Sequence, residues 1–256
     1  MRFHRVRVVR TVPHPGRVFT QGIIADGSSI WESAGSYGQS ALRRYDLGSD
    51  SASARAELPP ELFGEGICRV GASIWQLTWR ERVALRWDAA TLELREKVRY
   101  NRAGWGMCTV GGILDDQGKL TPLEVVTSDG TSELVCRDPD TLEPCAVVHV
   151  RCLGQRVRGL NDLTWAGGLV WANVAGTDCL AGICLATGEV TDVVDARGAA
   201  ERHRRDPQAI MNGIAALPQP GEFLLTGKSW RSIRQVRLLP DRDSGHLGRL
   251  LAGLSR

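Results

Sequence analysis

The segment FGEGI (63–67) is followed by IWQLTW (74–79), and this pair of segments is typical of a pattern that recurs along the chain. Glu65 stands between two glycines, which permit tight backbone geometry that is closed to residues with a Cβ. A single carboxyl among apolar and aromatic residues is expected to have a raised pKa, because burial disfavours its charge. Such a group can accept and return a proton near neutral pH. The alternative is a solvated Glu in a glycine-rich turn.

The second strand of the pattern recurs at intervals of about fifty residues. Equivalent positions lie 44 to 52 residues apart, at Trp31, Trp75, Val126, Trp171 and Phe223. Each copy contains short apolar runs separated by Gly, Asp, Asn or Pro, which favours strands over helices. The repeat therefore predicts an all-β fold, a five-bladed β-propeller. A pair of β-sandwiches is the alternative architecture.

The N-terminal strand, at residues 6–12, is free to join the sheet of the last copy near Val236. This pairing would close the ring and leave no open edge strand. Residues 1–256 are then expected to form a single β-propeller domain, in which residues 239–256 are a C-terminal tail. That tail is either a short helical cap on one face or a frayed end.

Composition excludes several classes of function. The net charge of +3 comes from interspersed charges of both signs, which predicts no nucleic-acid partner. No apolar run is long enough to cross a membrane. Residues 1–10 are charged and lack the apolar core of a signal peptide, which predicts a cytoplasmic protein, or a secreted one if a signal has been removed. The seven Cys and five His are scattered without CxxC or HExxH spacing, so we predict buried reduced cysteines, no metal site and no cofactor.

Polar and aromatic residues stand at the start of the first strand of each copy. These residues are Gln21, Glu65, Trp105, Asn161 and Asn212. Equivalent positions of successive blades meet at one end of a propeller's central channel. We therefore expect these side chains, together with Lys228 of the last copy, to line one cavity.

Ten short strings at blade spacing carry a family resemblance: FTQG (19–22), ESAGSYGQS (32–40), FGEGI (63–67), QLTW (76–79), GWGM (104–107), SDGT (128–131), LNDL (160–163), WANV (171–174), MNGIA (211–215) and TGKSW (226–230). Together they resemble the glutamine cyclotransferase family, the plant-type and bacterial glutaminyl cyclases. The resemblance implies a five-bladed propeller that is an acyltransferase without catalytic zinc. It also implies a peptide or small-molecule substrate with an N-terminal glutaminyl-like group, which is converted to pyroglutamate with release of ammonia. The oligomeric state stays open.

The chemistry of this reaction assigns roles to the candidate residues. One carboxyl can take the proton of the attacking amine and give it to the leaving NH2 group, and Glu65 is our choice. Charge that develops on the amide oxygen needs donors, for which Lys228, Asn161 and Gln21 are candidates. The resemblance supports these choices. The other predicted substrate-binding residues are Trp79, Trp105, Asn173 and Trp230. The three tryptophans supply flat apolar walls.

Several of these residues also have a structural interpretation. Lys228 could be a surface residue after a turn, and Asn161 and Asn212 could be turn formers. For Asn212, which precedes Gly213, we favour the turn. The pair at 129–130 is interpreted as a type I′ turn, and Trp31, Trp75 and Trp87 as residues that pack within or between the blades.

The sequence departs from the family pattern at two places. LNELE is replaced by LNDLT (160–164), and ANVW by ANVA (172–175). A methyl group at Ala175 in place of an indole would widen the pocket. Two alternatives follow: a family member that cyclises a different substrate in a biosynthetic pathway, and a propeller that binds a ligand without turnover.

Overall fold

The computed structural model describes residues 1–111, 123–201 and 208–241. Throughout these ranges every regular element is a β-strand and no helix is present, which confirms the predicted all-β class. A helix with the length and apolar character needed to cross a membrane is accordingly absent from the described ranges. Most of the predicted C-terminal tail, residues 242–256, lies outside the described residues.

Three antiparallel sheets of four strands follow one another along the chain. The first contains β2 (Thr20–Asp26), β3 (Ser29–Ala34), β4 (Ala41–Asp46) and β5 (Ala54–Glu57). The second contains β6 (Gly64–Val70), β7 (Ser73–Thr78), β8 (Val83–Asp88) and β9 (Leu94–Arg99). The third contains β10 (Met107–Val110), β11 (Glu124–Ser128), β12 (Glu133–Arg137) and β13 (Pro144–His149). Their strands are short, and most of their buried side chains are apolar.

The rest of the chain forms an eight-stranded sheet and a small hairpin. In sheet order the eight strands are β16 (Leu160–Ala166), β17 (Leu169–Val174), β18 (Cys179–Ile183), β19 (Val190–Asp195), β1 (Arg2–Pro13), β22 (Ser232–Pro240), β21 (Glu222–Gly227) and β20 (Met211–Ala216). The hairpin consists of β14 (Arg151–Cys152) and β15 (Gln155–Arg156).

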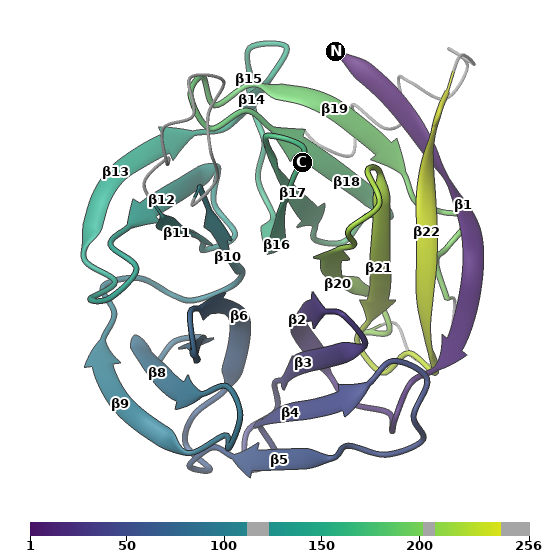
Figure 1. Ribbon diagram of the computed structural model, residues 1–256. Helices are drawn as coiled ribbons and strands as arrows, with labels where there is room; N and C mark the ends of the chain where they lie inside the picture. The colour runs from purple at the N-terminus through teal and green to yellow at the C-terminus, as the bar shows by residue number, and fades with distance from the viewer. Residues whose placement is uncertain (112–122, 202–207, 242–256) are drawn as a thin grey trace.

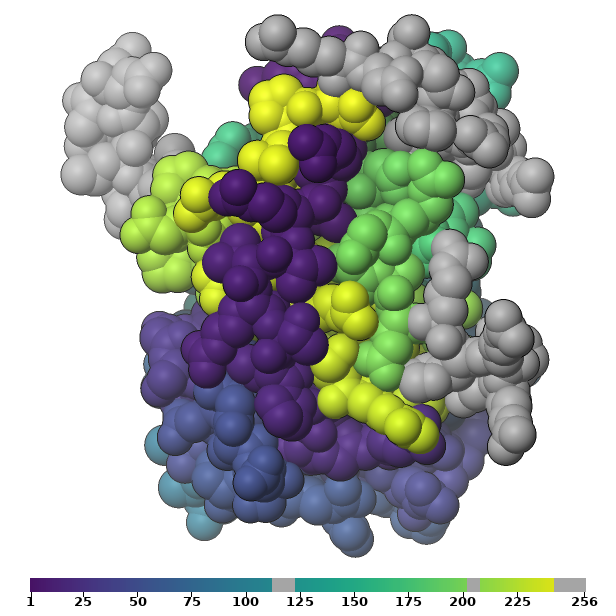
Figure 2. Space-filling model, turned by 90° about the vertical axis from the view of Figure 1, so that its right-hand side faces the viewer, coloured from purple at the N-terminus to yellow at the C-terminus, as the bar shows by residue number. Residues whose placement is uncertain are grey.

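Strand β1, at the beginning of the chain, pairs with strands from the last part of the chain. It pairs antiparallel with β22 and parallel with β19, so the expected pairing of the N-terminal strand with the last copy is present. In Figure 2 the purple N-terminal strand runs along one side of the molecule, with green and yellow segments beside it. Both edges of β1 are thereby hydrogen-bonded, which protects it from pairing with another chain.

The sheets are arranged around a common centre (Figure 1). The first strands of the five repeats, β2, β6, β10, β16 and β20, lie innermost, each contacts the next, and β20 contacts β2. This arrangement brings the first strands of all copies to one central region, although they are far apart in sequence.

The repeat-marking residues occupy equivalent places on the second strands. Trp31, Trp75, Val126, Trp171 and Phe223 lie on β3, β7, β11, β17 and β21, and all are buried.

Two tryptophans also link neighbouring sheets. The indole Nε1 of Trp31 donates to Ala89 O at 3.0 Å, and that of Trp75 donates to Pro139 O at 2.9 Å. Trp87 is likewise buried in the core, so the packing interpretation of these three tryptophans is confirmed. All seven cysteines are free and five of them are buried, as expected.

Candidate active site

A cavity of about 340 Å³ opens at one end of the innermost strands. It is lined by Phe19, Gln21, Phe63, Glu65, Trp79, Trp105, Asn161, Gln208 and Lys228. Six of these residues were predicted from the sequence to belong to the site. The structure brings them together from segments that span most of the chain. Gln21, Glu65, Trp105 and Asn161 stand at or near the start of an innermost strand, and Trp79 and Lys228 directly follow the ends of β7 and β21.

Glu65 lies in strand β6 and is 5% exposed, which rules out a solvated turn. The register of β6 with β7 shifts between Gly64 and Ile67, so the strand is irregular where it carries the acid. Neither flanking glycine has a positive φ. A Cβ at Gly66 would lie 2.5 Å from the carbonyl oxygen of Trp105, and one at Gly64 would lie 2.8 Å from Gln76 Nε2. The glycines therefore permit close approach of neighbouring segments that a Cβ would prevent, and they do not form the glycine-rich turn of the alternative interpretation.

The electrostatics of Glu65 are dominated by burial. Burial raises the pKa of the Glu65 carboxyl well above its usual range, the charge of Lys228 lowers it, and Asp162 and Glu81 raise it further. Burial lowers the pKa of the Lys228 ammonium, and Glu65 opposes this shift. A buried carboxyl whose pKa is raised above its usual range has the property that a proton shuttle needs.

Lys228 is partly buried at the cavity and is not a surface residue. Its backbone N–H donates to Ile210 O at 2.9 Å, and it forms an isolated bridge with Phe19. The ammonium Nζ lies 4.7 Å from the centroid of the Phe19 ring, a favourable cation–π distance.

Sequence reasoning missed the two phenylalanines of the wall. The Phe63 ring centroid is 6.4 Å from that of Phe19, 5.2 Å from that of Tyr37 and 5.6 Å from that of Trp79. A signal was present, because Phe19 and Phe63 each stand two residues before a cavity residue, Gln21 and Glu65. Alternation along a strand places residues i and i+2 on the same side. Gln208, which also lines the cavity, carried no such signal.

Trp105 packs against the turn between β11 and β12. A Cβ at Gly130 would lie 2.7 Å from the indole. The type I′ prediction for Asp129 and Gly130 is wrong, because of the two only Gly130 has a positive φ. Asp129 instead accepts hydrogen bonds from Arg102 and Thr131.

Two predicted substrate-binding residues lie outside the cavity lining. Trp230 is 1% exposed in the core, and its Nε1 donates to Ala209 O at 3.2 Å. Asn173 is fully buried and accepts a hydrogen bond from Gly213 N at 3.1 Å. Both residues stabilise the packing of the eight-stranded sheet behind the site.

The asparagines lie in strands and not in turns. Asn161, in β16, lines the cavity, and its Oδ1 is buried without a hydrogen-bond partner among the described residues. Asn212, in β20, is fully buried, and its Nδ2 donates to Gln21 Oε1 at 2.9 Å. The turn interpretation of Asn212 is therefore wrong.

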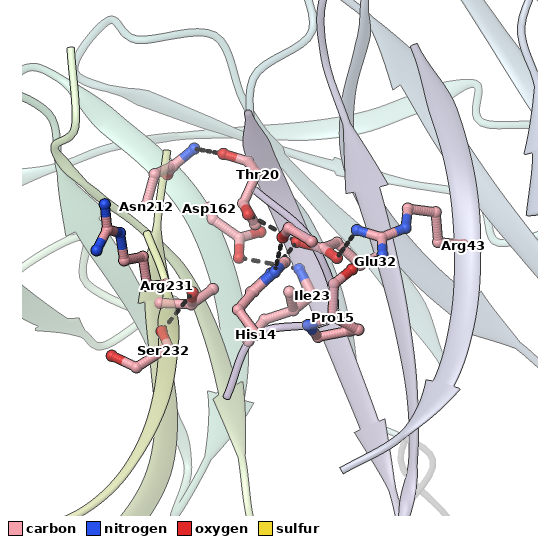
Figure 3. A network of polar contacts seen from close by, with 12 residues as sticks. His14, Pro15, Thr20, Ile23, Glu32, Arg43, Asp162, Asn212, Arg231 and Ser232 are labelled. Atoms are coloured by element: carbon pink, nitrogen blue, oxygen red, sulfur yellow. Dashed lines mark hydrogen bonds and ion pairs between the residues drawn. The ribbon is translucent and has the colours of Figure 1, made fainter. Parts of the chain in front are cut away.

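Asp162, in β16, is fully buried and lies beside residues of β2 (Figure 3). Its Oδ2 accepts hydrogen bonds from Ile214 N at 2.8 Å and from Ile23 N at 3.4 Å. Burial raises the pKa of this carboxyl well above its usual range, and the backbone donors oppose the shift. Other innermost strands carry glycine at the equivalent position: Gly22, Gly66, Gly106 and Gly213. A Cβ at Gly22 would lie 3.1 Å from Asp162 Oδ1, so the glycine of β2 leaves space for this carboxyl.

The residues replaced at the two departures from the family pattern do not line this cavity. Neither Ala175 nor Thr164 belongs to its lining. Thr164 lines a different cavity of about 260 Å³, and its hydroxyl accepts a hydrogen bond from Ala216 N at 3.1 Å. Within the ranges that the structure describes, no group of three or more His, Cys, Asp or Glu side chains is placed to hold a metal ion.

The protein is an all-β ring, and one of its cavities contains a buried acid, a partly buried lysine and aromatic walls. These features indicate the class of all-β proteins with a candidate acid–base site. The chain belongs to the glutamine cyclotransferase family, whose sequence model matches residues 1–238. It is 30% identical to the glutaminyl-peptide cyclotransferase of Arabidopsis thaliana over 243 residues, which are 93% of this chain and 72% of that protein. It is similar to the crystal structure of Myxococcus xanthus glutaminyl cyclase, with a TM-score of 0.82 and 30% identity, covering 94% of this chain and 99% of that one. The resemblance inferred from the strings is confirmed.

Proposed function

We propose that this protein is a glutaminyl-peptide cyclotransferase that converts an N-terminal glutamine to pyroglutamate and releases ammonia. The observation that carries the proposal is the buried Glu65 beside Lys228 in a cavity with aromatic walls. Family membership supports the same reaction class, that of an acyltransferase.

The reaction forms one bond and breaks one bond. The substrate α-amine attacks the carbon of its own side-chain amide, and the C–NH2 bond then breaks. Because both groups belong to one molecule, holding the ring-forming conformer supplies much of the rate enhancement. Glu65 takes the proton that the amine loses and gives it to the leaving NH2, so the enzyme returns to its starting protonation state.

The remaining cavity residues stabilise and enclose the reacting amide. Lys228 and Gln21 supply positive charge or N–H groups to the developing oxyanion. The Oδ1 of Asn161, which has no hydrogen-bond partner among the described residues, can accept a hydrogen bond from an N–H group of the substrate. Asn161 then acts as an acceptor at this atom, whereas the sequence predicted a donor. Phe19, Phe63 and Trp79 exclude water, which strengthens these interactions.

The same proposal extends to the architecture. We interpret the ring as a single five-bladed β-propeller domain that is closed by β1. The cyclic contacts of the innermost strands and the pairing of β1 with β22 support this interpretation.

Ammonia release tests the function directly. We expect turnover of glutamine β-naphthylamide and of peptides that begin with Gln, measured by a coupled ammonia assay. A peptide that begins with Asn is the matched control, since its cyclisation would require a strained four-membered ring. The absence of ammonia from every N-terminal glutamine substrate, with the protein folded, would exclude the proposed function.

The proposed reaction needs no metal ion. We therefore expect kcat to be unchanged after prolonged dialysis against EDTA or 1,10-phenanthroline. Inactivation by either chelator, followed by recovery when a divalent ion is restored, would contradict a metal-independent mechanism.

A further inference from the structure

We propose that Asn212 is a positioning residue that orients the side-chain amide of Gln21, so that Gln21 presents N–H donors to the cavity. This inference rests on the proposed function for its catalytic consequence. Its structural content, the orientation of one amide by another, can be tested without turnover.

The hydrogen-bond partners of Asn212 determine which terminal atom of its side-chain amide is the nitrogen and which is the oxygen. The atom assigned as Nδ2 lies 3.2 Å from Thr20 O and 3.4 Å from Gln21 O, which are both backbone carbonyl oxygens. Carbonyl oxygens only accept hydrogen bonds, so the atom that faces them must be the NH2 group. Oδ1 is therefore at the other end of the Asn212 amide.

The orientation of Gln21 follows from that of Asn212. The Gln21 atom that lies 2.9 Å from Asn212 Nδ2 must be an acceptor, and hence Oε1. Gln21 Nε2 is left with its two N–H groups at the other end of the amide. Because Gln21 lines the cavity, these donors are available to an amide oxygen of the substrate. An amide in the opposite orientation would offer a carbonyl oxygen and repel the developing oxyanion.

Two further observations support a positioning role. The first is that the Oδ1 of Asn212 is buried with no hydrogen-bond partner among the described residues, which is unfavourable for the folded state. Packing alone would not require an amide at this position. The part of the Asn212 side chain that has a role is therefore its Nδ2 donor.

The carbonyl of Thr20 is also held in place. The Thr20 hydroxyl donates to Glu32 Oε1 at 2.6 Å, and Glu32 is held in turn by His14 and Arg43 (Figure 3). The reference atoms that orient Asn212 therefore belong to a rigid buried network, which in turn fixes Gln21.

The test is a double-mutant cycle in the full-length protein. Asn212→Asp replaces the donor with an acceptor of the same shape, so Gln21 should turn its amide and direct Oε1 into the cavity. We expect kcat to fall about 100-fold, as for loss of one oxyanion donor, with a smaller change in KM. In the Gln21→Leu background the same change should have no further effect on kcat, because Asn212 acts through Gln21. A further fall in kcat in that background would assign Asn212 a merely structural role and overturn the proposal.

A second measurement does not depend on activity. In 15N-labelled protein, the side-chain NH2 signals of Gln21 are identified by their absence in Gln21→Leu. They should shift in Asn212→Asp, and also in Asn212→Leu if the aspartate variant does not fold. Unchanged Gln21 signals in a folded variant would refute the inference. Absence of ammonia release by the wild-type protein, combined with shifted signals, would refute the proposed function alone.

Discussion

Replacing Glu65 with glutamine is expected to lower kcat by about 10²–10⁴-fold, the range that general acid–base catalysis contributes. Glutamine keeps the shape of the side chain and its place in β6, but it cannot accept and return a proton. KM should change less, because the aromatic walls and the donors around the substrate remain. Steady-state ammonia release from an N-terminal glutamine peptide measures the effect.

Glu222→Gln is the matched control for this variant. Glu222 is also a buried carboxylate on a strand, and it binds Gln235 and Arg237 outside the cavity lining. We expect its kcat to stay within a few-fold of wild type. Turnover by Glu65→Gln at the wild-type rate would remove Glu65 from the mechanism.

The convergence of the site could be predicted from the repeat alone. Gln21, Glu65, Trp105 and Asn161 stand at one position of successive copies, and ring symmetry brings equivalent positions together. No single stretch of sequence carries this information, since each residue by itself is compatible with a surface or turn position.

Trp230 shows what the repeat could not predict. It follows the cavity residue Lys228 by two positions and was predicted to supply a flat apolar wall of the pocket. Ser229 however has a positive φ of 59°, and Trp230 N donates to Gly227 O at 3.1 Å, so the chain turns back and the indole packs against Gly227. A non-glycine residue with positive φ is uncommon, and the local sequence does not require one here.

Asn212 was misassigned for a different reason. Asn-Gly is a strong signal for a hairpin turn, but Gly213 lies inside β20 with a φ of 122°, and a Cβ there would lie 2.7 Å from the Thr226 methyl. The positive φ and the tertiary contact both require glycine at this position, and sequence alone does not distinguish these requirements from a turn.

Replacing Glu32 with glutamine is expected to destabilise the protein by about 3–5 kcal/mol, the usual effect of removing one partner from a buried ion pair. The Glu32 carboxylate is fully buried and accepts hydrogen bonds from His14 Nε2 at 2.8 Å, Thr20 Oγ1 at 2.6 Å and Arg43 Nη1 at 3.0 Å (Figure 3). His14 Nδ1 also faces the carbonyl of Gly16. Both ring nitrogens therefore face acceptors, which favours the imidazolium form.

The stability of this network should depend on pH in both directions. Burial alone would lower the pKa of His14, but Glu32 raises it above its ordinary value of 6.5. Its contribution is therefore complete below pH 6.5 and is lost as the pH rises through the folded-state pKa. Burial alone would raise the pKa of Glu32, but His14, Arg43 and Thr20 lower it below 4.5. That contribution is present above pH 4.5 and is lost as the pH falls through the folded-state pKa.

Urea unfolding of wild type and Glu32→Gln between pH 4 and 8 measures both effects. The variant should be least stable relative to wild type between about pH 4.5 and 6.5. Above pH 6.5 the difference in the free energy of unfolding should shrink. The wild type then loses the stability that charged His14 gains from Glu32, and the variant has no such contribution to lose. Glu57→Gln, at an exposed acid of the same sheet, is the control and should change the free energy of unfolding by less than about 0.5 kcal/mol. If the two variants unfold with equal free energies at every pH, Glu32 does not hold the network together.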